Sequence, residues 1–383
     1  MASIQPLGND RYKIFVDVEV EEGQPRKRRT KTVSAKSDLA LRKAVTAFEI
    51  EVSQENQNLS KITFKAFAER WMNVYVRSKL AIKTRNSYQS YLDNGISDFF
   101  NNMQLSKIKT YHVEKFFAEQ KKIEAGSQIG KYLCLCSIFT RAIKWGLLEK
   151  SPMEDVDKPA ERSRRNRPFK AYTEKQLQEV LTYVDRLAYP KLRAQVKLAC
   201  LVGMRMAEIA GLRKECIDFV HNTIRVDKTL QYDKEKKEFS LGPVKNKTPR
   251  TVNAPKKFMQ GELKEYVVWH NWMEKKCGEA WSPLKIKKEP VNLLFTNDIG
   301  FPNHPNSMAN EWAKFLHRHP ELPYLNFHGL RHTCASMMLL KNVNFKIIQE
   351  QLGHKNIEET IQTYSHLEEK SKEEALNRLD EIL

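Results

Sequence analysis

The sequence predicts a multidomain, mainly α-helical protein with small β-sheets, of the α+β class. Three observations predict it: an alternating strand pattern near the N-terminus, a long stretch with apolar residues at helical spacing, and short strands between helices in the second half. The chain has 383 residues, and at roughly 100–200 residues per domain this length predicts two or three domains. Hydrophobic residues make up 41% of the chain, which is typical of globular domains with a core.

Residues 1–57 are expected to form a small basic module. Residues 11–20 alternate and are rich in β-branched and aromatic types, which predicts a strand, and a return strand follows a turn. Ser37 is suited to cap a helix over about 38–55, so a two- or three-stranded sheet is combined with one helix. The return strand carries the cations Arg26, Lys27, Arg28, Arg29 and Lys31. Lys and Arg also protect sheet edges, but five cations within six positions favour contact with DNA.

Residues 60–155 predict a domain of four or five helices, separated from the first module by a polar bridge at 54–60. Its apolar residues recur at helical spacing, beginning with Phe64, Phe67 and Trp71, and aromatic stripes of this kind usually form a core. The predicted polar faces are basic, which fits a clamp over a duplex. They carry Lys79, Lys83, Arg85, Lys107, Lys109 and Lys131, of which we expect Lys83 and Arg85 to contact DNA.

A basic linker is predicted at 156–170, within a segment from 149 to 170 in which prolines interrupt the helical pattern. A linker of this kind can lie along the DNA backbone between two domains that hold DNA. The third domain, 171–383, is expected to be mainly α with a small antiparallel sheet, and a capping box at Thr173 and Gln176 starts its first helix. The linker carries Arg162, Arg164, Arg165 and Arg167.

The charge balance points to a polyanionic partner. Lys and Arg number 65 against 47 Asp and Glu, which gives a net charge of +18 and favours nucleic acid. No run of 18 or more apolar residues is present, so we expect no transmembrane helix, and the N-terminus lacks the apolar segment of a signal peptide. The six cysteines form no CxxC pair. We therefore expect reduced thiols in a cytoplasmic protein, with neither disulfides nor structural zinc.

Five short segments of the third domain carry candidate chemistry. Arg205 follows a glycine at a helix start, although such an arginine often pairs with a carboxylate such as Glu208. Residues 243–252 predict a basic β-hairpin that contains Lys245, and Asn246 excludes a phosphate-binding P-loop there. The remaining segments contain His328 and Arg331 on one face of a helix start, then His354, then Tyr364. A zinc-protease motif at His328 and His332 is excluded because Gly329 replaces the required glutamate.

This ordered set resembles the tyrosine recombinase (phage integrase) family. The six residues occur in family order and at family-like spacing: Arg205, Lys245, His328, Arg331, His354 and Tyr364. The resemblance is close from about 170 to 383 and looser over 60–160, where it implies a SAM-like core-binding domain. Residues 1–55 look like the arm-binding domain of lambda-type and conjugative-transposon integrases. Because Asn246 follows Lys245, where the family usually has a small residue, Lys247 is an alternative for the hairpin lysine.

The resemblance implies a role for each residue, and the physical chemistry agrees. Tyr364 would attack phosphorus and form a 3′-phosphotyrosyl bond, and Lys245 would protonate the leaving 5′-oxygen. Arg205 and Arg331 would hold the nonbridging oxygens with forked donors, because guanidinium stays ionised. His328 would assist the tyrosine, and His354 would donate a hydrogen bond to the phosphate. With this charge supplied by side chains we expect no metal and no other cofactor.

The expected function is therefore site-specific integration and excision of a prophage or other mobile element through a Holliday junction. The resemblance implies a homotetramer on double-stranded DNA with arm-type and core-type sites, an excisionase, a host DNA-bending protein, no membrane partner, and a bacterial protein associated with the nucleoid. The segment after Tyr364 predicts a short apolar helix, at about 371–382, which docks in cis or on a neighbouring protomer. The alternatives are a type IB topoisomerase and a catalytically silent DNA-binding regulator.

Overall fold

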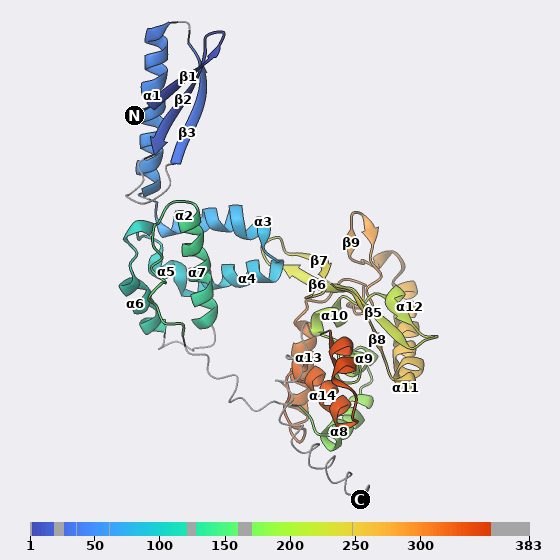
Figure 1. Cartoon of the computed structure of the whole chain (residues 1–383). Helices are drawn as coiled ribbons and strands as arrows, with labels where there is room; N and C mark the ends of the chain where they lie inside the picture. The colour runs from blue at the N-terminus through green and yellow to red at the C-terminus, as the bar shows by residue number, and fades with distance from the viewer. Residues whose placement is uncertain are drawn as a thin grey trace, which may run out of the picture. The chain divides into compact units, whose positions relative to one another are not determined.

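The computed structural model describes residues 2–18, 27–35, 37–60, 62–120, 128–159, 171–246 and 248–353 (Figure 1). The chain divides into two compact units, Met1–Arg162 and Ser163–Leu383, and each is described by itself. Among the described helices, none is long and apolar enough to cross a bilayer. All six cysteines are free thiols, as the sequence predicts.

The N-terminal module is a three-stranded antiparallel sheet with one helix along one face (Figure 1). Its strands are β1 (Ala2–Gly8), β2 (Arg11–Val18) and β3 (Lys27–Ser34), and its helix is α1 (Asp38–Ser60). Ile14 and Val16 on β2 pack against Phe48 of the helix. The expected polar bridge at 54–60 is wrong, because α1 continues without a break to Ser60.

The alternation of side chains along β3 divides the predicted basic run between the two faces of the sheet. Arg29 and Lys31 stand opposite Val16 and Ile14 and so share the face that α1 covers. The Lys31 Nζ accordingly lies 5.4 Å from the centre of the Phe48 ring. Arg28 stands opposite Asp17 and lies on the face away from α1. We call this second surface the open face. It also carries Arg11, Lys13, Phe15, Thr30 and Thr32.

The rest of the first unit is a helical bundle, as the apolar stripes predict. Phe64, Phe67 and Trp71 are fully buried in its core. Two of its helices contain π-helical turns, and the second of these kinks at Gly95, whose φ is +111°. The elements are α2 (Phe64–Trp71), η1 (Met72–Val76), α3 (Arg77–Lys79), α4 (Ile82–Tyr91), η2 (Leu92–Ile96), α5 (Ser97–Phe100), η3 (Leu105–Lys107), α6 (Thr110–Gln120) and α7 (Gln128–Lys144).

Two predictions for this bundle are wrong in detail. Lys131 was expected on a polar face, but it is buried, donates to Gln120 Oε1 at 2.5 Å and lies over the Phe116 ring. The linker was expected to begin at 156, but Val156 packs with Met153 into the bundle core. A short turn after α7 brings both side chains back onto the bundle, and the basic part of the linker, 160–170, lies outside the described residues.

The second unit is mainly helical with short sheets, as predicted. Its first helix, α8, starts at the predicted capping box: Thr173 accepts from the backbone N–H of Gln176, and the Gln176 side chain accepts from that of Thr173. The helices are α8 (Glu174–Asp185), α9 (Pro190–Cys200), α10 (Met206–Ala210), η6 (Lys214–Cys216), α11 (Lys256–Phe258), η7 (Met259–Leu263), α12 (Lys264–Cys277), η8 (Gly278–Ala280), α13 (Ser307–Arg318), α14 (Phe327–Leu340) and α15 (Phe345–Leu352).

The strands of this unit form three small antiparallel sheets in its described part, ordered β4-β5-β8, β6-β7 and β10-β9. The predicted hairpin at 243–252 is wrong. β7 pairs with β6 and β8 pairs with β5, so residues 244–249 connect two different sheets. The strands are β4 (Ile217–Asp218), β5 (Thr223–Val226), β6 (Lys228–Asp233), β7 (Glu238–Pro243), β8 (Arg250–Asn253), β9 (Lys285–Ile286) and β10 (Glu289–Pro290).

Candidate active site

A cationic cavity of about 640 Å³ lies in the second unit where the 244–249 connection meets α15. Its lining includes the cations Arg205, Lys245, Arg250 and Lys346, against one carboxylate, Glu350. An excess of positive charge in a concave site favours a polyanion such as the DNA backbone. The cavity therefore unites Arg205 and Lys245, two of the residues singled out in the sequence.

Arg205 is positioned by a tight turn between α9 and α10. The turn needs Gly203, whose φ is +78° and whose added Cβ would lie 2.6 Å from the Leu352 side chain. Arg205 then caps α10 at its N-terminus, and its backbone N–H donates to Glu208 Oε2 at 2.9 Å. Its guanidinium donates to Glu208 Oε1 at 2.9 Å and to the carbonyl oxygen of Gly353 at 2.9 Å. The pairing with Glu208 that the sequence suggested is present, and the side chain still lines the cavity.

The first turn of α14 carries His328 and Arg331. Asn326 caps this helix by accepting from the Gly329 N–H at 2.9 Å, and Gly329 leaves room for Leu325, which an added Cβ would meet at 2.4 Å. Arg331 is buried and donates to the carbonyl oxygens of Gly203 and Leu352. His328 is exposed, and its ring contacts the His332 ring with the centroids 4.8 Å apart.

Three arginines converge on the C-terminal end of α15. The last carbonyl groups of a helix have no partner within it, so they need outside donors, and cations are favourable at this end. Here Arg250 Nε donates to Gln351 O at 3.1 Å, Arg331 to Leu352 O, and Arg205 to Gly353 O. Asn246 Nδ2 also donates to Gly353 O, at 3.1 Å. The arginine-capped end of α15 therefore holds together residues that are up to 148 positions apart in sequence.

Glu208 is the buried anion behind this cluster. Its side chain is 0% exposed, and Arg250 forks over it, with Nη1–Oε1 at 3.0 Å and Nη2–Oε2 at 2.8 Å. Burial alone would raise the pKa of this carboxyl, but the hydrogen bonds and charge of Arg250, with those of Arg205, outweigh it and lower the pKa to about 2. Glu208 is therefore ionised at neutral pH and holds two guanidinium groups in fixed positions.

The structure does not describe every residue that the sequence singled out. His354, Tyr364 and the helix expected after Tyr364 lie outside the described residues, which end at Gly353. Lys83 and Arg85 are on α4, far in sequence from the cavity and in the other unit. The structure also does not describe several predicted DNA contacts and the alternative hairpin lysine: Arg26, Arg162, Arg164, Arg165, Arg167, Lys247 and the side chain of Lys27.

Sequence reasoning missed Arg250 and Asn246 as parts of the site. In the sequence, Asn246 only excludes a P-loop, and Arg250 is one of several cations in the segment predicted to form a hairpin. The partners of Arg250 lie 42 and 101 residues away, so no local pattern reveals them. The one available signal was the position of both residues in a short basic segment that also contains Lys245.

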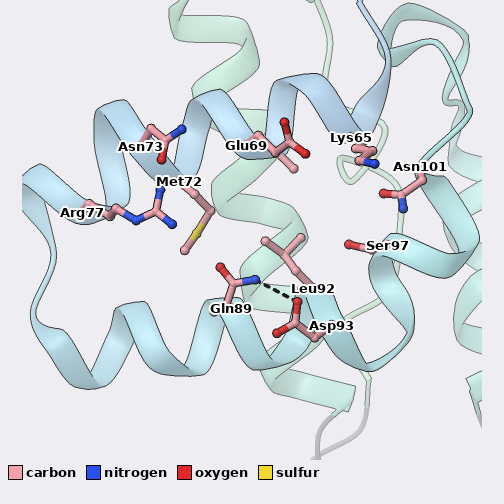
Figure 2. Close-up of a pocket in the computed structure, with 11 residues that line it drawn as sticks. Lys65, Glu69, Met72, Asn73, Arg77, Gln89, Leu92, Asp93, Ser97 and Asn101 are labelled. Atoms are coloured by element: carbon pink, nitrogen blue, oxygen red, sulfur yellow. Dashed lines mark hydrogen bonds between the residues drawn. The ribbon is translucent and has the colours of Figure 1, made fainter. Parts of the chain in front are cut away.

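A second pocket, of about 360 Å³, lies in the helical bundle between α2–η1–α3 and α4–η2–α5 (Figure 2). Its lining is polar, and Gln89 donates to Asp93 Oδ1 at 2.8 Å across one turn of helix. Its charged lining residues are two cations, Lys65 and Arg77, and two carboxylates, Glu69 and Asp93. Because these charges balance, the pocket has no preference for a polyanion, unlike the cavity at Arg205.

Two family models match the chain. The model described as the phage integrase family matches residues 170–371, and the model described as the phage integrase N-terminal SAM-like domain matches residues 63–119. The ICEBs1 integrase of Bacillus subtilis is 22% identical, and the match covers 100% of both chains. A protein named tyrosine recombinase XerC-like, from Caldanaerobacter subterraneus, is 23% identical over 85% of each chain.

Solved structures share the fold. The integrase of the Tn1549 transposon, in complex with transposon right end DNA, has a TM-score of 0.65 and 17% identity, and the match covers 83% of this chain and 100% of that chain. A lambda integrase dimer bound to a COC′ core site has a TM-score of 0.56 and 14% identity, and the match covers 94% of this chain and 93% of that one. The similarity therefore extends over the N-terminal module as well as over the later parts of the chain.

Proposed function

The chain belongs to the phage integrase family and is a tyrosine recombinase of a mobile element, and from this premise we propose that it cuts and rejoins DNA through Tyr364. The observation that carries the proposal is the meeting of Arg205 and Arg331 at the end of α15. His354 follows in sequence directly after that end, and Tyr364 follows ten residues later.

The proposed chemistry is a pair of transesterifications. The Tyr364 oxygen attacks the scissile phosphorus, the bond from phosphorus to the 5′-oxygen breaks, and Lys245 gives that oxygen a proton. A 3′-phosphotyrosyl bond conserves the energy of the broken bond, so the 5′-hydroxyl of the partner duplex can reverse the reaction and exchange strands. Repetition on the second pair of strands passes through a Holliday junction.

The charges of the cavity support the roles of the remaining residues. Arg205 and Arg331 would hold the two nonbridging oxygens, where forked guanidinium donors are worth most. The exposed His328, near the start of α14, would accept or share the hydroxyl proton of Tyr364. The tyrosine hydroxyl needs such a partner because its ordinary pKa is near 10. His354 would donate a hydrogen bond to the same phosphate.

Two kinds of DNA site fit the organisation of the chain. The bundle and the second unit would grip core-type sites, with Lys83 and Arg85 among the backbone contacts. The N-terminal module would hold arm-type sites, and its open face is the surface suited to them, since Arg11, Lys13 and Arg28 lie there and α1 does not cover it. Binding two sites at once raises avidity through effective concentration.

The assembly we propose is a homotetramer on DNA, with an excisionase and a host DNA-bending protein as partners in the bacterial cytoplasm. The apolar helix expected at 371–382 would dock on a neighbouring protomer once DNA is bound. A type IB topoisomerase is not favoured, because the family match and the N-terminal module point to strand exchange. A silent regulator would leave the six-residue set without a use.

The test is a suicide-substrate assay with nicked attachment-site DNA in EDTA, analysed on a denaturing protein gel. We expect a covalent protein–DNA adduct with the wild type and none with Tyr364→Phe, because the variant lacks only the attacking oxygen. A verified attachment site that is bound without adduct formation by the wild type would contradict the assignment and favour the silent regulator.

A further inference from the structure

We infer that Arg250 is a positioning residue of the strand-cleavage reaction, acting through Glu208 and through the end of α15. It is the first residue of β8, and the roles proposed above leave it unused. Its three side-chain nitrogens all donate to internal partners: two to the Glu208 carboxylate and one to the Gln351 carbonyl. The inference rests on the proposed cleavage reaction and adds a residue to it.

The first line of evidence is the way two arginines share Glu208. Oε1 accepts from the guanidinium groups of Arg205 and Arg250, and Oε2 accepts from the Arg205 backbone N–H and from Arg250. Arg205 and Arg250 are the charged groups that face this carboxylate in the described part of the chain. A buried carboxylate that loses one of two such partners is costly to keep ionised. Arg250 therefore keeps Glu208 charged and in place, and Glu208 in turn orients Arg205.

The second line of evidence is the fit of Arg250 against the end of α15. Gly353 ends this helix in the left-handed region, with φ of +64°. A Cβ added at Gly353 would lie 2.9 Å from Cδ and 3.0 Å from Nε of Arg250. The arginine side chain occupies the space that the missing side chain leaves. It thereby fixes the backbone that accepts from Arg205 and leads into His354.

The third line of evidence is exposure, which separates Arg250 from the cations that face outward. The Arg250 side chain is 12% exposed, whereas Lys245 and Lys346 line the same cavity as exposed residues. All three side-chain nitrogens of Arg250 donate to internal partners, two of them to the buried Glu208 carboxylate, whereas Arg205 directs only one side-chain nitrogen at Glu208. We therefore expect Arg250 to affect the reaction by holding its neighbours in place and not by contacting the DNA.

The experiment compares full-length Arg250→Met, Arg250→Lys and wild type in single-turnover cleavage of the nicked attachment site over a range of pH. We expect Arg250→Met to cleave at least tenfold more slowly while its affinity for the site changes less than threefold. The acidic limb of its rate profile moves to higher pH, because Glu208 takes up a proton more readily without Arg250. Arg250→Lys keeps one charged hydrogen bond to Glu208 and recovers part of the rate.

A double-mutant cycle tests the route of the effect. In a Glu208→Gln background, Arg250→Met is expected to cost clearly less than in the wild-type background, since only the route through the end of α15 remains. The matched control is Arg213→Met: Arg213 Nη2 donates to both oxygens of a carboxylate of the same unit, Asp227, at 2.8 and 2.6 Å, and its other partners are Cys216 and Glu215. We expect this control to cleave within threefold of wild type.

Three outcomes would overturn the inference. They are an unchanged rate in Arg250→Met, an equal loss in the Glu208→Gln background, and a loss of affinity with a salt slope lower by about one, which marks a direct phosphate contact. Thermal unfolding checks that each variant folds, and if Arg250→Met does not, Arg250→Lys gives the same test through its pH profile. Absence of an adduct with wild type would instead contradict the proposed function.

Discussion

At the scale of single residues, the two lysines that flank Asn246 are the candidates for the general acid that protonates the leaving 5′-oxygen. Lys245 lines the cavity beside Arg205, and Lys247 is the alternative that the sequence leaves open. A general acid contributes about 10²–10⁴-fold to the rate. We therefore expect Lys245→Ala to slow cleavage by that order and Lys247→Ala to cleave nearly as fast as wild type.

A substrate with a sulfur atom in place of the bridging 5′-oxygen provides the control for this prediction. A thiolate leaves without a proton, so this substrate restores cleavage by Lys245→Ala if the lysine acts as the acid. Rescue of Lys247→Ala, with no rescue of Lys245→Ala, would transfer the role to Lys247. Single-turnover cleavage of both substrates by both variants is the measurement.

Side chains with local partners were predictable from the sequence, and those with distant partners were not. The pairing of Arg205 with Glu208 spans three residues within one helix start, so the spacing reveals it. Arg250 is different, because its partners come from α10 and from the end of α15. The prediction for Lys131 failed for a related reason. It occupies a polar position in its helix pattern, but its ammonium group donates to Gln120, which lies eleven residues earlier on another helix.

At the scale of elements, the two faces of the N-terminal sheet give different expectations for cations that are neighbours in sequence. Replacing Lys13 and Arg28 with alanine removes two charges from the open face, whereas replacing Arg29 and Lys31 removes two from the face that α1 covers. Each phosphate contact contributes about 0.9 to the slope of log affinity against log salt. We expect the first pair of changes to lower the slope for arm-site binding by about two.

The second pair is the matched control, with the same loss of charge from the same sheet. Its slope is expected to fall by much less than that of the first pair, as measured by arm-site binding over a salt series. An equal fall for both pairs would show that the sheet binds DNA through its overall charge and that neither face is preferred.

Elements with a strong local pattern were correctly predicted, as was the return of β3 onto β2, but the strand pairing at 243–252 was not. The stripes of the bundle and the capping box of α8 depend on residues three or four apart, and both are present. The hairpin at 243–252 failed because β7 and β8 each find a partner earlier in the chain, β6 and β5. Strand pairing is a long-range property, and a basic segment flanked by strand patterns cannot reveal it. The end of α1 was missed because its last turns are mostly polar and carry no apolar stripe at helical spacing.

At the scale of the whole molecule, acid should destabilise the second unit through a buried histidine. His270 is buried and shares a 3.1 Å hydrogen bond with Thr296 Oγ1. Burial and the positive charge of Lys214, opposed by Glu274, lower its pKa from 6.5 to about 4. The unfolded chain thus binds a proton on this ring before the folded chain does. The stability that neutral His270 provides is complete above pH 6.5 and is lost as the pH falls towards 4.

We expect the free energy of unfolding to fall over this range by up to about 1.4 kcal/mol per pH unit on account of this ring. His270→Gln should flatten that part of the profile, as measured by urea unfolding at several pH values. His317→Gln, which changes an exposed histidine on α13, should leave the profile as in wild type. A profile that is equally steep in His270→Gln would assign the acid sensitivity to other groups.

The capping of α15 by three arginines also has a consequence for the order in which a newly made chain gains its function. Arg205 is synthesised 148 residues before Gly353, and Arg331 21 residues before Leu352, the residues whose carbonyl oxygens receive their N–H groups. A nascent chain that has emerged only as far as α14 therefore lacks the acceptors that shape the site. Because ribosomes add about 5–20 residues per second, the earlier domains have time to fold before those acceptors emerge. The earlier domains of an unfinished copy are thus folded before the proposed active site is complete.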